Sequence, residues 1–128
     1  MILVDTSVWV DHLRVGDTIV EALLESGRVL VHPFVVGELA LGKLRQRQAI
    51  LASLQDLPRA NAASDQEVLH FIERYALAGL GIGYVDVHLL AATQLTPGSS
   101  LWTRDKRLSA VAERLGLASR RSTDPSGL

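Results

Sequence analysis

The chain has 128 residues, which is enough for one domain with its own hydrophobic core. Hydrophobic residues make up 48% of the sequence, which excludes disorder for most of its length, and the absence of cysteine excludes disulfide bonds and thiolate metal sites. The net charge of −1 does not by itself indicate nucleic acid, although every cationic side chain except Lys43 and Lys106 is an arginine, the residue best suited to phosphate contacts.

The first predicted element is a strand at the start of the chain. The apolar run Met1-Ile2-Leu3-Val4 has no polar alternation, which is typical of a strand buried on both faces of a parallel sheet. Asp5 follows at the carboxyl end of this strand, where open parallel sheets bind their ligands. A helix is predicted over residues 8–13. We expect Ser7 to cap it, which leaves Asp5 free for another role.

The rest of the chain alternates helices with short strands. Pro33 suits the first turn of a helix, Ser64 and Glu67 form a capping box, and Gly116 suits a helix stop. The residue spacing predicts helices at 18–24, 34–43, 47–54, 68–75, 85–95 and 106–115, and strands at 28–32, 57–62, 100–103 and 117–120. This alternation is typical of an α/β fold with a parallel sheet and helices on both sides. We expect a single domain over residues 1–121 and a frayed tail over residues 122–128.

The location of the protein is predicted from what the sequence lacks. Its start has no basic region followed by the apolar core of a signal segment, and no apolar run approaches the roughly 20 residues that span a bilayer. A chain without cysteine also fits a reducing compartment. We therefore expect a soluble, cytoplasmic protein with no membrane partner.

Four acidic residues either have apolar neighbours on the same predicted helix face or follow the end of a predicted strand. They are Asp5, Glu38, Asp86 and Asp105. Each has a purely structural interpretation, since Asp86 could favour a helix dipole, Asp105 could cap a helix, and Glu38 could lie at the edge of an amphipathic helix. The fold, however, brings strand ends and helix starts to one edge of the sheet. We therefore expect the four carboxylates to converge there.

Convergence of four carboxylates would require a cation or protons. Two unpaired carboxylates about 4 Å apart repel by about 4 kcal/mol at an effective dielectric constant of about 20. A site that offers only oxygen ligands selects Mg²⁺ or Mn²⁺ over zinc. Because Mg²⁺ keeps several waters and is often completed by substrate phosphates, such a site indicates phosphodiester or phosphoryl chemistry.

These acids, with Thr103 two residues before Asp105, resemble in order and spacing the PIN-domain ribonucleases. The likeness is strongest to the small VapC-type toxins of type II bacterial toxin–antitoxin systems. It extends from Met1 to about Ala118, and its motifs lie at residues 1–14, 37–39, 84–92 and 101–108. One departure is Gly83-Tyr84-Val85, where relatives often carry another acidic or polar residue.

The resemblance implies both a fold and an activity. The fold is a three-layer α/β/α sandwich with a central parallel sheet of about five strands. The acids match the positions that bind Mg²⁺ or Mn²⁺ in this family, and Thr103 matches its usual hydroxyl. The activity is metal-dependent endoribonuclease cleavage of structured RNA, such as tRNA or rRNA. The resemblance also implies a homodimer and neutralisation by a cognate VapB-type antitoxin.

The expected mechanism is hydrolysis by a metal-activated water. Asp5 and Asp105 are expected to bind the ion directly, Glu38 and Asp86 directly or through water, and Thr103 to orient a ligand or water. Attack by water rather than by the RNA 2′-hydroxyl leaves a 5′-phosphate and a 3′-hydroxyl. Phosphate contacts are expected from two cationic clusters beside the acids, Lys43, Arg45 and Arg47 and then Arg104, Lys106 and Arg107.

Other residues are expected to be structural. We expect His12, His32 and His88 to be satisfied or solvent-facing, and Trp9 and Trp102 to lie in the core or at an interface. The apolar faces of residues 29–44 and 50–54 exceed what a small domain buries, which predicts a groove for an amphipathic antitoxin segment.

Rival functions are a phosphoacceptor receiver domain, a haloacid-dehalogenase phosphatase and a catalytically inactive PIN-like module that binds RNA or protein. The receiver would need an acid pair and a lysine that we cannot place, and the phosphatase would need Asp-x-Asp where the chain has Asp5-Thr6-Ser7. The intact set of four acids argues against the inactive module.

Overall fold

The computed structural model describes residues 1–119, which form a small parallel sheet flanked by helices. Strands β1 (Ile2–Val4), β2 (Val29–Leu30) and β3 (Ser100–Trp102) pair in the order β2-β1-β3, and both pairings are parallel. The first strand of the chain is therefore the central one. Its burial on both sides confirms the prediction from the unbroken apolar run, since Ile2, Leu3 and Val4 are all buried.

The expected sheet of about five strands is wrong for the described residues, which contain three strands. The two weaker segments form one parallel bridge each, Val31 with Arg59 and Leu101 with Ala118. Pro58 has no N–H to donate to a sheet, and only its carbonyl takes part, accepting from Val31 N at 2.9 Å. The sheet therefore ends at each edge in a single bridge instead of a full outer strand.

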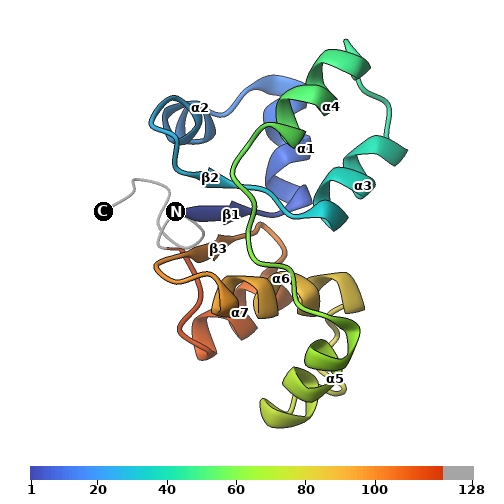
Figure 1. The fold of residues 1–128 in the computed structure, drawn as a ribbon, viewed down its shortest axis with the longest axis vertical. Helices are drawn as coiled ribbons and strands as arrows, with labels where there is room; N and C mark the ends of the chain where they lie inside the picture. The colour runs from blue at the N-terminus through green and yellow to red at the C-terminus, as the bar shows by residue number, and fades with distance from the viewer. Residues whose placement is uncertain (120–128) are drawn as a thin grey trace.

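Seven helices surround these strands in the described part of the chain. They are α1 (Thr6–Val15), α2 (Thr18–Glu25), α3 (Pro33–Leu41), α4 (Arg47–Gln55), α5 (Asp65–Arg74), α6 (Tyr84–Leu95) and α7 (Lys106–Arg114). Figure 1 shows α1 to α4 on the β2 side of the sheet and α5 to α7 on the β3 side. This arrangement agrees with the predicted helices on both sides of a parallel sheet.

The helix starts show why the chain turns where it does. Pro33 lies in the first turn of α3, and Ser64 and Glu67 form the predicted capping box of α5. The expectation that Ser7 caps the first helix is wrong, because that helix begins at Thr6 and Asp5 is its N-cap. A β-region backbone directly after β1 puts the Asp5 side chain, two residues earlier than expected, in the capping position.

The hydrophobic core joins the strands to helices on both sides. Leu89 and Leu90 of α6 and Leu108 of α7 are fully buried, as is Val8 of α1. Trp9 and Trp102 are also buried, at 2% and 3% exposure, which confirms their predicted place in the core. Within the described residues no helix combines the length and apolar character that crossing a bilayer requires.

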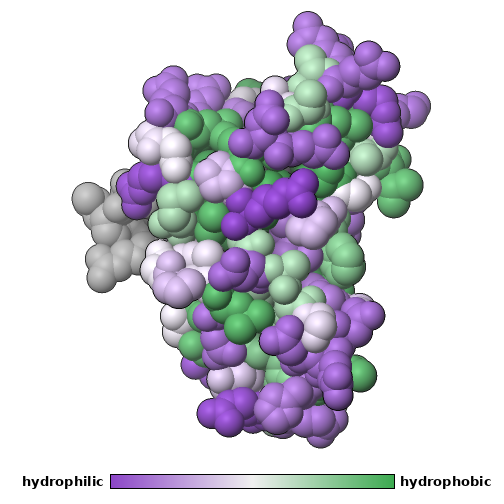
Figure 2. All heavy atoms as spheres, viewed as in Figure 1, coloured by the Kyte–Doolittle hydropathy of each residue, from purple (hydrophilic) through white to green (hydrophobic). Residues whose placement is uncertain are grey.

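The surface is polar at its extremities and partly apolar between them. In Figure 2 the outer ends of α4 and α5 are covered by hydrophilic residues, while hydrophobic ones reach the surface around the end of α3. Leu41, the last residue of α3, is 91% exposed. The predicted frayed tail, residues 122–128, and position 120 of the predicted last strand lie outside the described residues.

Candidate active site

The site is built around Asp5 at the carboxyl end of the central strand. Its carboxylate is buried, and one oxygen, Oδ2, accepts hydrogen bonds from the hydroxyls of Ser7 at 2.7 Å and Thr103 at 2.8 Å. The Ser7 N–H donates to the same oxygen at 3.4 Å. Asp5 is therefore fixed by its own helix cap and by a residue that follows β3.

The two hydroxyls are themselves oriented by the loop between β3 and α7. The backbone N–H of Arg104 donates to Ser7 Oγ at 3.0 Å, and that of Asp105 donates to Thr103 Oγ1 at 3.0 Å. Each hydroxyl thus accepts from a backbone N–H and donates to Asp5. This chain of bonds sets the direction of both hydroxyl protons and couples the orientation of Asp5 to the position of Asp105.

Asp86 and Asp105 are bonded by groups close in sequence, whereas Glu38 is bonded by a residue of α1. Glu38 Oε1 accepts from the Thr6 hydroxyl at 2.7 Å, Asp86 Oδ2 accepts from Gly83 N at 2.8 Å, and Asp105 Oδ1 accepts from the N–H groups of Arg107 and Leu108. In all four acids, one carboxylate oxygen takes these bonds. The second oxygen of each accepts none from the described residues.

The pKa of Asp86 shows that the four acids share one electrostatic environment. Burial raises the pKa of this carboxyl, and the hydrogen bond from Gly83 opposes that effect. The negative charges of Asp5, Asp105 and Glu38 raise it further. Residues separated by up to 100 positions are therefore brought to one place, as the sequence predicts.

The donor chemistry of this cluster fits Mg²⁺ or Mn²⁺. All its side-chain ligands are oxygens, which hard divalent cations prefer, and each acid keeps one oxygen available. Within residues 1–119, however, no three acidic or histidine side chains already have an arrangement that could hold an ion. Side-chain rotation is therefore needed before several of these carboxylates can share one cation.

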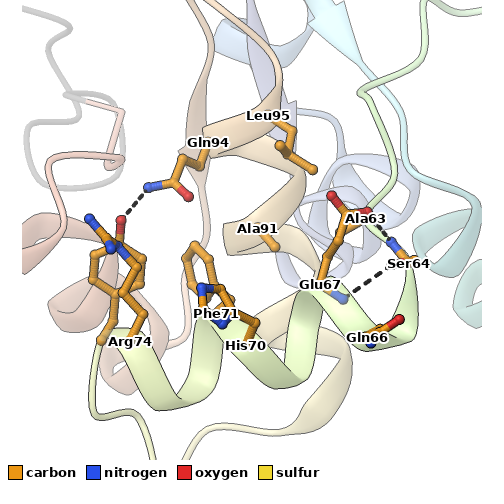
Figure 3. A pocket seen from close by; sticks show the side chains of 11 residues that line it. Ala63, Ser64, Gln66, Glu67, His70, Phe71, Arg74, Ala91, Gln94 and Leu95 are labelled. Atoms are coloured by element: carbon orange, nitrogen blue, oxygen red, sulfur yellow. Dashed lines mark hydrogen bonds between the residues drawn. The ribbon is translucent and has the colours of Figure 1, made fainter.

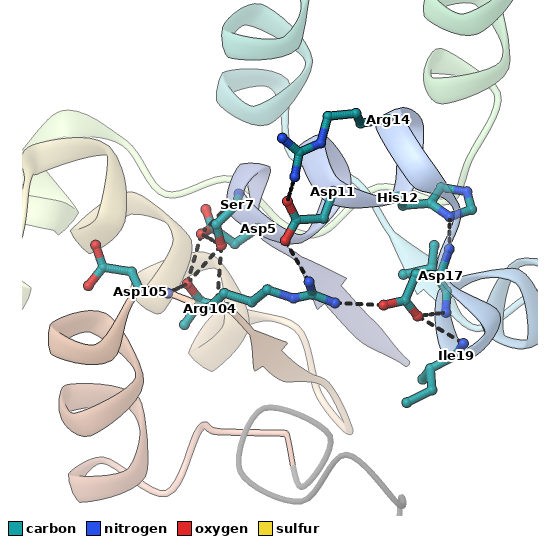
Figure 4. Close-up of polar contacts among 11 residues, drawn as sticks. Asp5, Ser7, Asp11, His12, Arg14, Asp17, Ile19, Arg104 and Asp105 are labelled. Atoms are coloured by element: carbon teal, nitrogen blue, oxygen red, sulfur yellow. Dashed lines mark hydrogen bonds and ion pairs between the residues drawn. The ribbon is translucent and has the colours of Figure 1, made fainter.

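Two of the cations predicted to bind RNA are engaged in the fold. Arg104 pairs with Asp11 Oδ2 at 2.5 Å and with Asp17 Oδ2 at 2.6 Å, which ties the loop before α7 to α1 and to the start of α2 (Figure 4). Arg47 donates to the carbonyls of Ala40 and Gly42 and so closes the end of α3. Nothing in the spacing of the sequence identifies these partners.

The other cations predicted to bind RNA are Lys43, Arg45, Lys106 and Arg107, for which no ion pair is found among the described residues. Lys43 and Arg45 line a cavity of about 470 Å³ that Glu38 also lines, while Lys106 opens α7 directly after Asp105. The side chain of Arg107 packs against Gly81, where an added Cβ would come within 2.6 Å of Nη1. Gly81 has a positive φ as well, so both conformation and space favour glycine there.

Another cavity, of about 420 Å³, lies between α5 and α6 and contains none of the four acids (Figure 3). Phe71, Ala91 and Leu95 give it an apolar floor, and Gln94 donates to the Tyr75 hydroxyl at its edge. Its lining includes Glu67, which is bonded within the capping box of α5, and Arg74. The four predicted site acids meet elsewhere, around Asp5, so this cavity is separate from the predicted site.

Comparison with known proteins agrees with this geometry. The PIN-domain family model matches residues 2–114, which include all four acids and Thr103. The chain belongs to the PIN-domain family. Over 118 residues, 92% of this chain and 95% of the relative, it is 45% identical to Ribonuclease VapC32 of Mycobacterium tuberculosis strain CDC 1551 / Oshkosh. Ribonuclease VapC32 of strain ATCC 25618 / H37Rv matches to the same extent.

Membership confirms the predicted resemblance to VapC-type PIN ribonucleases. The roles of the individual site residues stay predictions, which the contacts above make specific. Sequence reasoning missed the contribution of Asp11 and Asp17, because their arginine partner lies 93 and 87 residues away along the chain.

Proposed function

We propose that this PIN-domain ribonuclease is a Mg²⁺- or Mn²⁺-dependent endoribonuclease toxin that cuts structured RNA and is neutralised by a VapB-type antitoxin. The observation that carries the proposal is the convergence of Asp5, Glu38, Asp86 and Asp105, each with one carboxylate oxygen held and the other available. A cluster of like charges at a sheet edge serves no structural need that simple helix caps would not meet.

The metal would be held by Asp5 and Asp105 directly and by Glu38 and Asp86 directly or through water. Once bound, it supplies a more acidic water and a polarised scissile phosphate. Thr103 and Ser7 keep Asp5 Oδ2 bonded, and Oδ1 accepts no hydrogen bond from the described residues. Burial and the charges of the other three acids raise the pKa of Asp86, and a bound cation would offset that effect.

RNA is proposed to approach past the cavity that Glu38 shares with Lys43 and Arg45. These two side chains place positive charge beside an acidic cluster that would otherwise repel phosphate. Arg14 lines the same cavity. Single-stranded or looped RNA suits this path, because proteins read structured RNA mostly at its unpaired positions.

The antitoxin is proposed to occupy an apolar groove that leads into the site. A cavity of about 300 Å³ between α1, α2 and α4 is lined by Trp9, Leu24 and Leu54, and it shares Leu13 and Ile50 with the cavity beside Glu38. An amphipathic segment laid along both would bury apolar side chains at one end and reach the acids at the other. The proposed homodimer rests on the family resemblance alone.

The decisive experiment is cleavage of total RNA by the purified chain, freed of any partner, with Mn²⁺, with Mg²⁺ or with EDTA. Asp5→Asn is the control, because it keeps the helix cap while removing the charge. We expect metal-dependent cleavage that leaves a 5′-phosphate and is lost in the variant. A 2′,3′-cyclic phosphate would exclude the hydrolytic mechanism, and binding of RNA without any cleavage would leave only an RNA-binding module.

A further inference from the structure

Two aromatic side chains are exposed on the helices that carry Glu38 and Asp86, whereas three of the six Phe, Trp and Tyr residues are buried. Phe34 and Tyr84 are 38% and 46% exposed, whereas Trp9, Phe71 and Trp102 are exposed by no more than 5%. They come from different helices, Phe34 from the first turn of α3 and Tyr84 from the start of α6. Because burial of an aromatic side chain stabilises a fold, the exposure of these two rings forgoes that stabilisation.

Phe34 and Tyr84 are held at a fixed spacing by a buried histidine. The ring of His88 lies 4.6 Å from that of Phe34 and 4.7 Å from that of Tyr84, and both contacts are edge-to-face. His32, also buried, contacts Phe34 at 5.1 Å. The two exposed rings are therefore supported from behind by a second layer of rings, and little freedom is left to lose when a ligand binds.

A polar contact fixes the orientation of Tyr84. Its hydroxyl donates to Asp65 Oδ1 at 3.2 Å, and the same oxygen lies 3.5 Å from Nε2 of His88. The Asp65 side chain is 84% exposed, so its negative charge stands at the rim of the rings. The negative charge of Asp65 disfavours binding of a phosphate next to the rings. An uncharged planar group can still bind against the ring faces.

Each aromatic residue lies within one helical turn of one of the acids along its own helix. Phe34 precedes Glu38 by four residues on α3, and positions four apart lie on the same helix face with about 6 Å of rise between them. Tyr84 shares the first turn of α6 with Asp86. Because Phe34 shares a helix face with Glu38 and both rings contact His88, a phosphodiester held at Glu38 would bring its neighbouring nucleotide close to the pair.

From this placement we propose that Phe34 and Tyr84 form a stacking platform for an unpaired nucleobase of the RNA, next to the phosphate that is cut. The proposal rests on the proposed function and deepens it, because it names the state of the RNA at the site. Bases stack on aromatic side chains only when they are splayed out of a helix, and such stacking tolerates different bases. The platform therefore selects a flexible, unpaired position more than a particular sequence.

The test measures RNA binding by the full-length chain carrying Asp5→Asn, so that binding is separated from cleavage. The probe is a short unpaired oligoribonucleotide with one 2-aminopurine, whose fluorescence reports stacking, and its fully paired duplex is the comparison. We expect tighter binding of the unpaired probe and a change in its fluorescence. Phe34→Leu and Tyr84→Leu should each weaken binding by roughly 5- to 100-fold and remove the fluorescence change.

Ring-retaining variants separate stacking from damage to the fold. Phe34→Tyr and Tyr84→Phe should restore most of the binding lost in the leucine variants, whereas Leu69→Ala, an exposed apolar residue on α5, should leave it unchanged. Equal binding of duplex and unpaired probe, or leucine variants that bind like their parent, would overturn the platform. So would leucine variants that lose only the binding of a protein partner.

The failure of the platform and the failure of the proposed function give different results. If the chain with Asp5 intact cuts RNA with Mn²⁺ while the leucine variants cut with unchanged KM and kcat, only the platform is wrong. If the chain with Asp5 intact cuts nothing with any metal, the proposed function is wrong. A platform role raises KM more than it lowers kcat, whereas loss of the fold lowers the active fraction and leaves KM unchanged.

Discussion

The two halves of the acidic cluster are built differently. Asp5 and Asp105 are joined through the hydroxyl of Thr103, which donates to Asp5 in a buried bond between residues 98 positions apart and accepts from Asp105 N in a part-buried one. Glu38 and Asp86, by contrast, have exposed hydrogen bonds from Thr6 and Gly83. One half is preorganised by the fold, while the other is free to adjust to a cation and a substrate.

Among the variants that test this difference, we expect removal of the Asp5 charge to have the largest effect. Asp5→Asn should reduce cleavage by at least about 100-fold, because a bound metal contributes several kcal/mol to the transition state. Metal-dependent cleavage rates of the purified variant measure this. A residual rate within tenfold of the parent would mean that the preorganised half does not hold the ion.

Loss of the relay that orients Asp5 should have the next largest effect. Thr103→Val keeps the shape of a side chain that is 1% exposed but removes both the bond to Asp5 and the acceptor for Asp105 N. Substitution of a partner that orients a metal ligand typically costs about 10- to 100-fold in activity or metal affinity. A Mn²⁺ titration of cleavage measures it, and Thr103→Ser is the control that should keep most of the activity.

A change of pH tests the packing of α3 and α6, the helices that carry the adjustable half. Burial, with a smaller contribution from the charge of the neighbouring His88, lowers the pKa of His32 from 6.5 to about 4. The neutral side chain is therefore favoured in the folded state. Its contribution to stability is complete above pH 6.5 and is lost as the pH falls towards 4.

When the pH is lowered from about 7.5 to about 5, protonation of His32 alone should reduce the free energy of unfolding by about 2 kcal/mol. His32→Asn is the matched variant, because its side-chain oxygen can still accept the bond that His32 Nδ1 accepts from Phe34 N. Urea unfolding at the two pH values measures the difference. An equal loss of stability in the parent and the variant would assign the effect to the carboxylates.

A smaller effect is expected on the adjustable side. Thr6→Val removes the exposed hydrogen bond to Glu38, and we expect less than about a tenfold change in the same Mn²⁺ titration, since a typical hydrogen bond contributes about 1 kcal/mol. Thr6→Ser keeps the hydroxyl and serves as the control. A loss as large as that of Thr103→Val would show that both halves are equally preorganised.

The smallest test concerns the cations. Arg45→Gln should reduce the salt dependence of RNA binding, by about one in the logarithmic slope, because Arg45 lines the cavity beside Glu38. Arg104→Gln should leave that slope unchanged, because its charge is already paired with Asp11 and Asp17. Binding of the same RNA at several salt concentrations compares them. Equal slopes for the two variants would contradict the distinction.

Much of the fold was predictable because it depends on local pattern. The apolar run ending at Asp5, the proline that opens α3 and the capping box at Ser64 each act within a few residues. The outer sheet segments were harder, since a single bridge depends on what lies beside a strand. The histidines were expected to be satisfied or solvent-facing, but His32 and His88 are buried, and Nε2 of each has no hydrogen-bond partner among the described residues.

The sequence by itself determined the order of the elements, the burial of the first strand and the identity of the four acids, because periodicity and residue type carry that information. Only the tertiary structure decided that Asp5 is the N-cap of α1 and accepts a hydrogen bond from Thr103. It also decided that Arg104 forms ion pairs with Asp11 and Asp17. Those contacts join residues about 90 or more positions apart, or depend on the backbone angle at a single residue. Neither leaves a pattern along the chain.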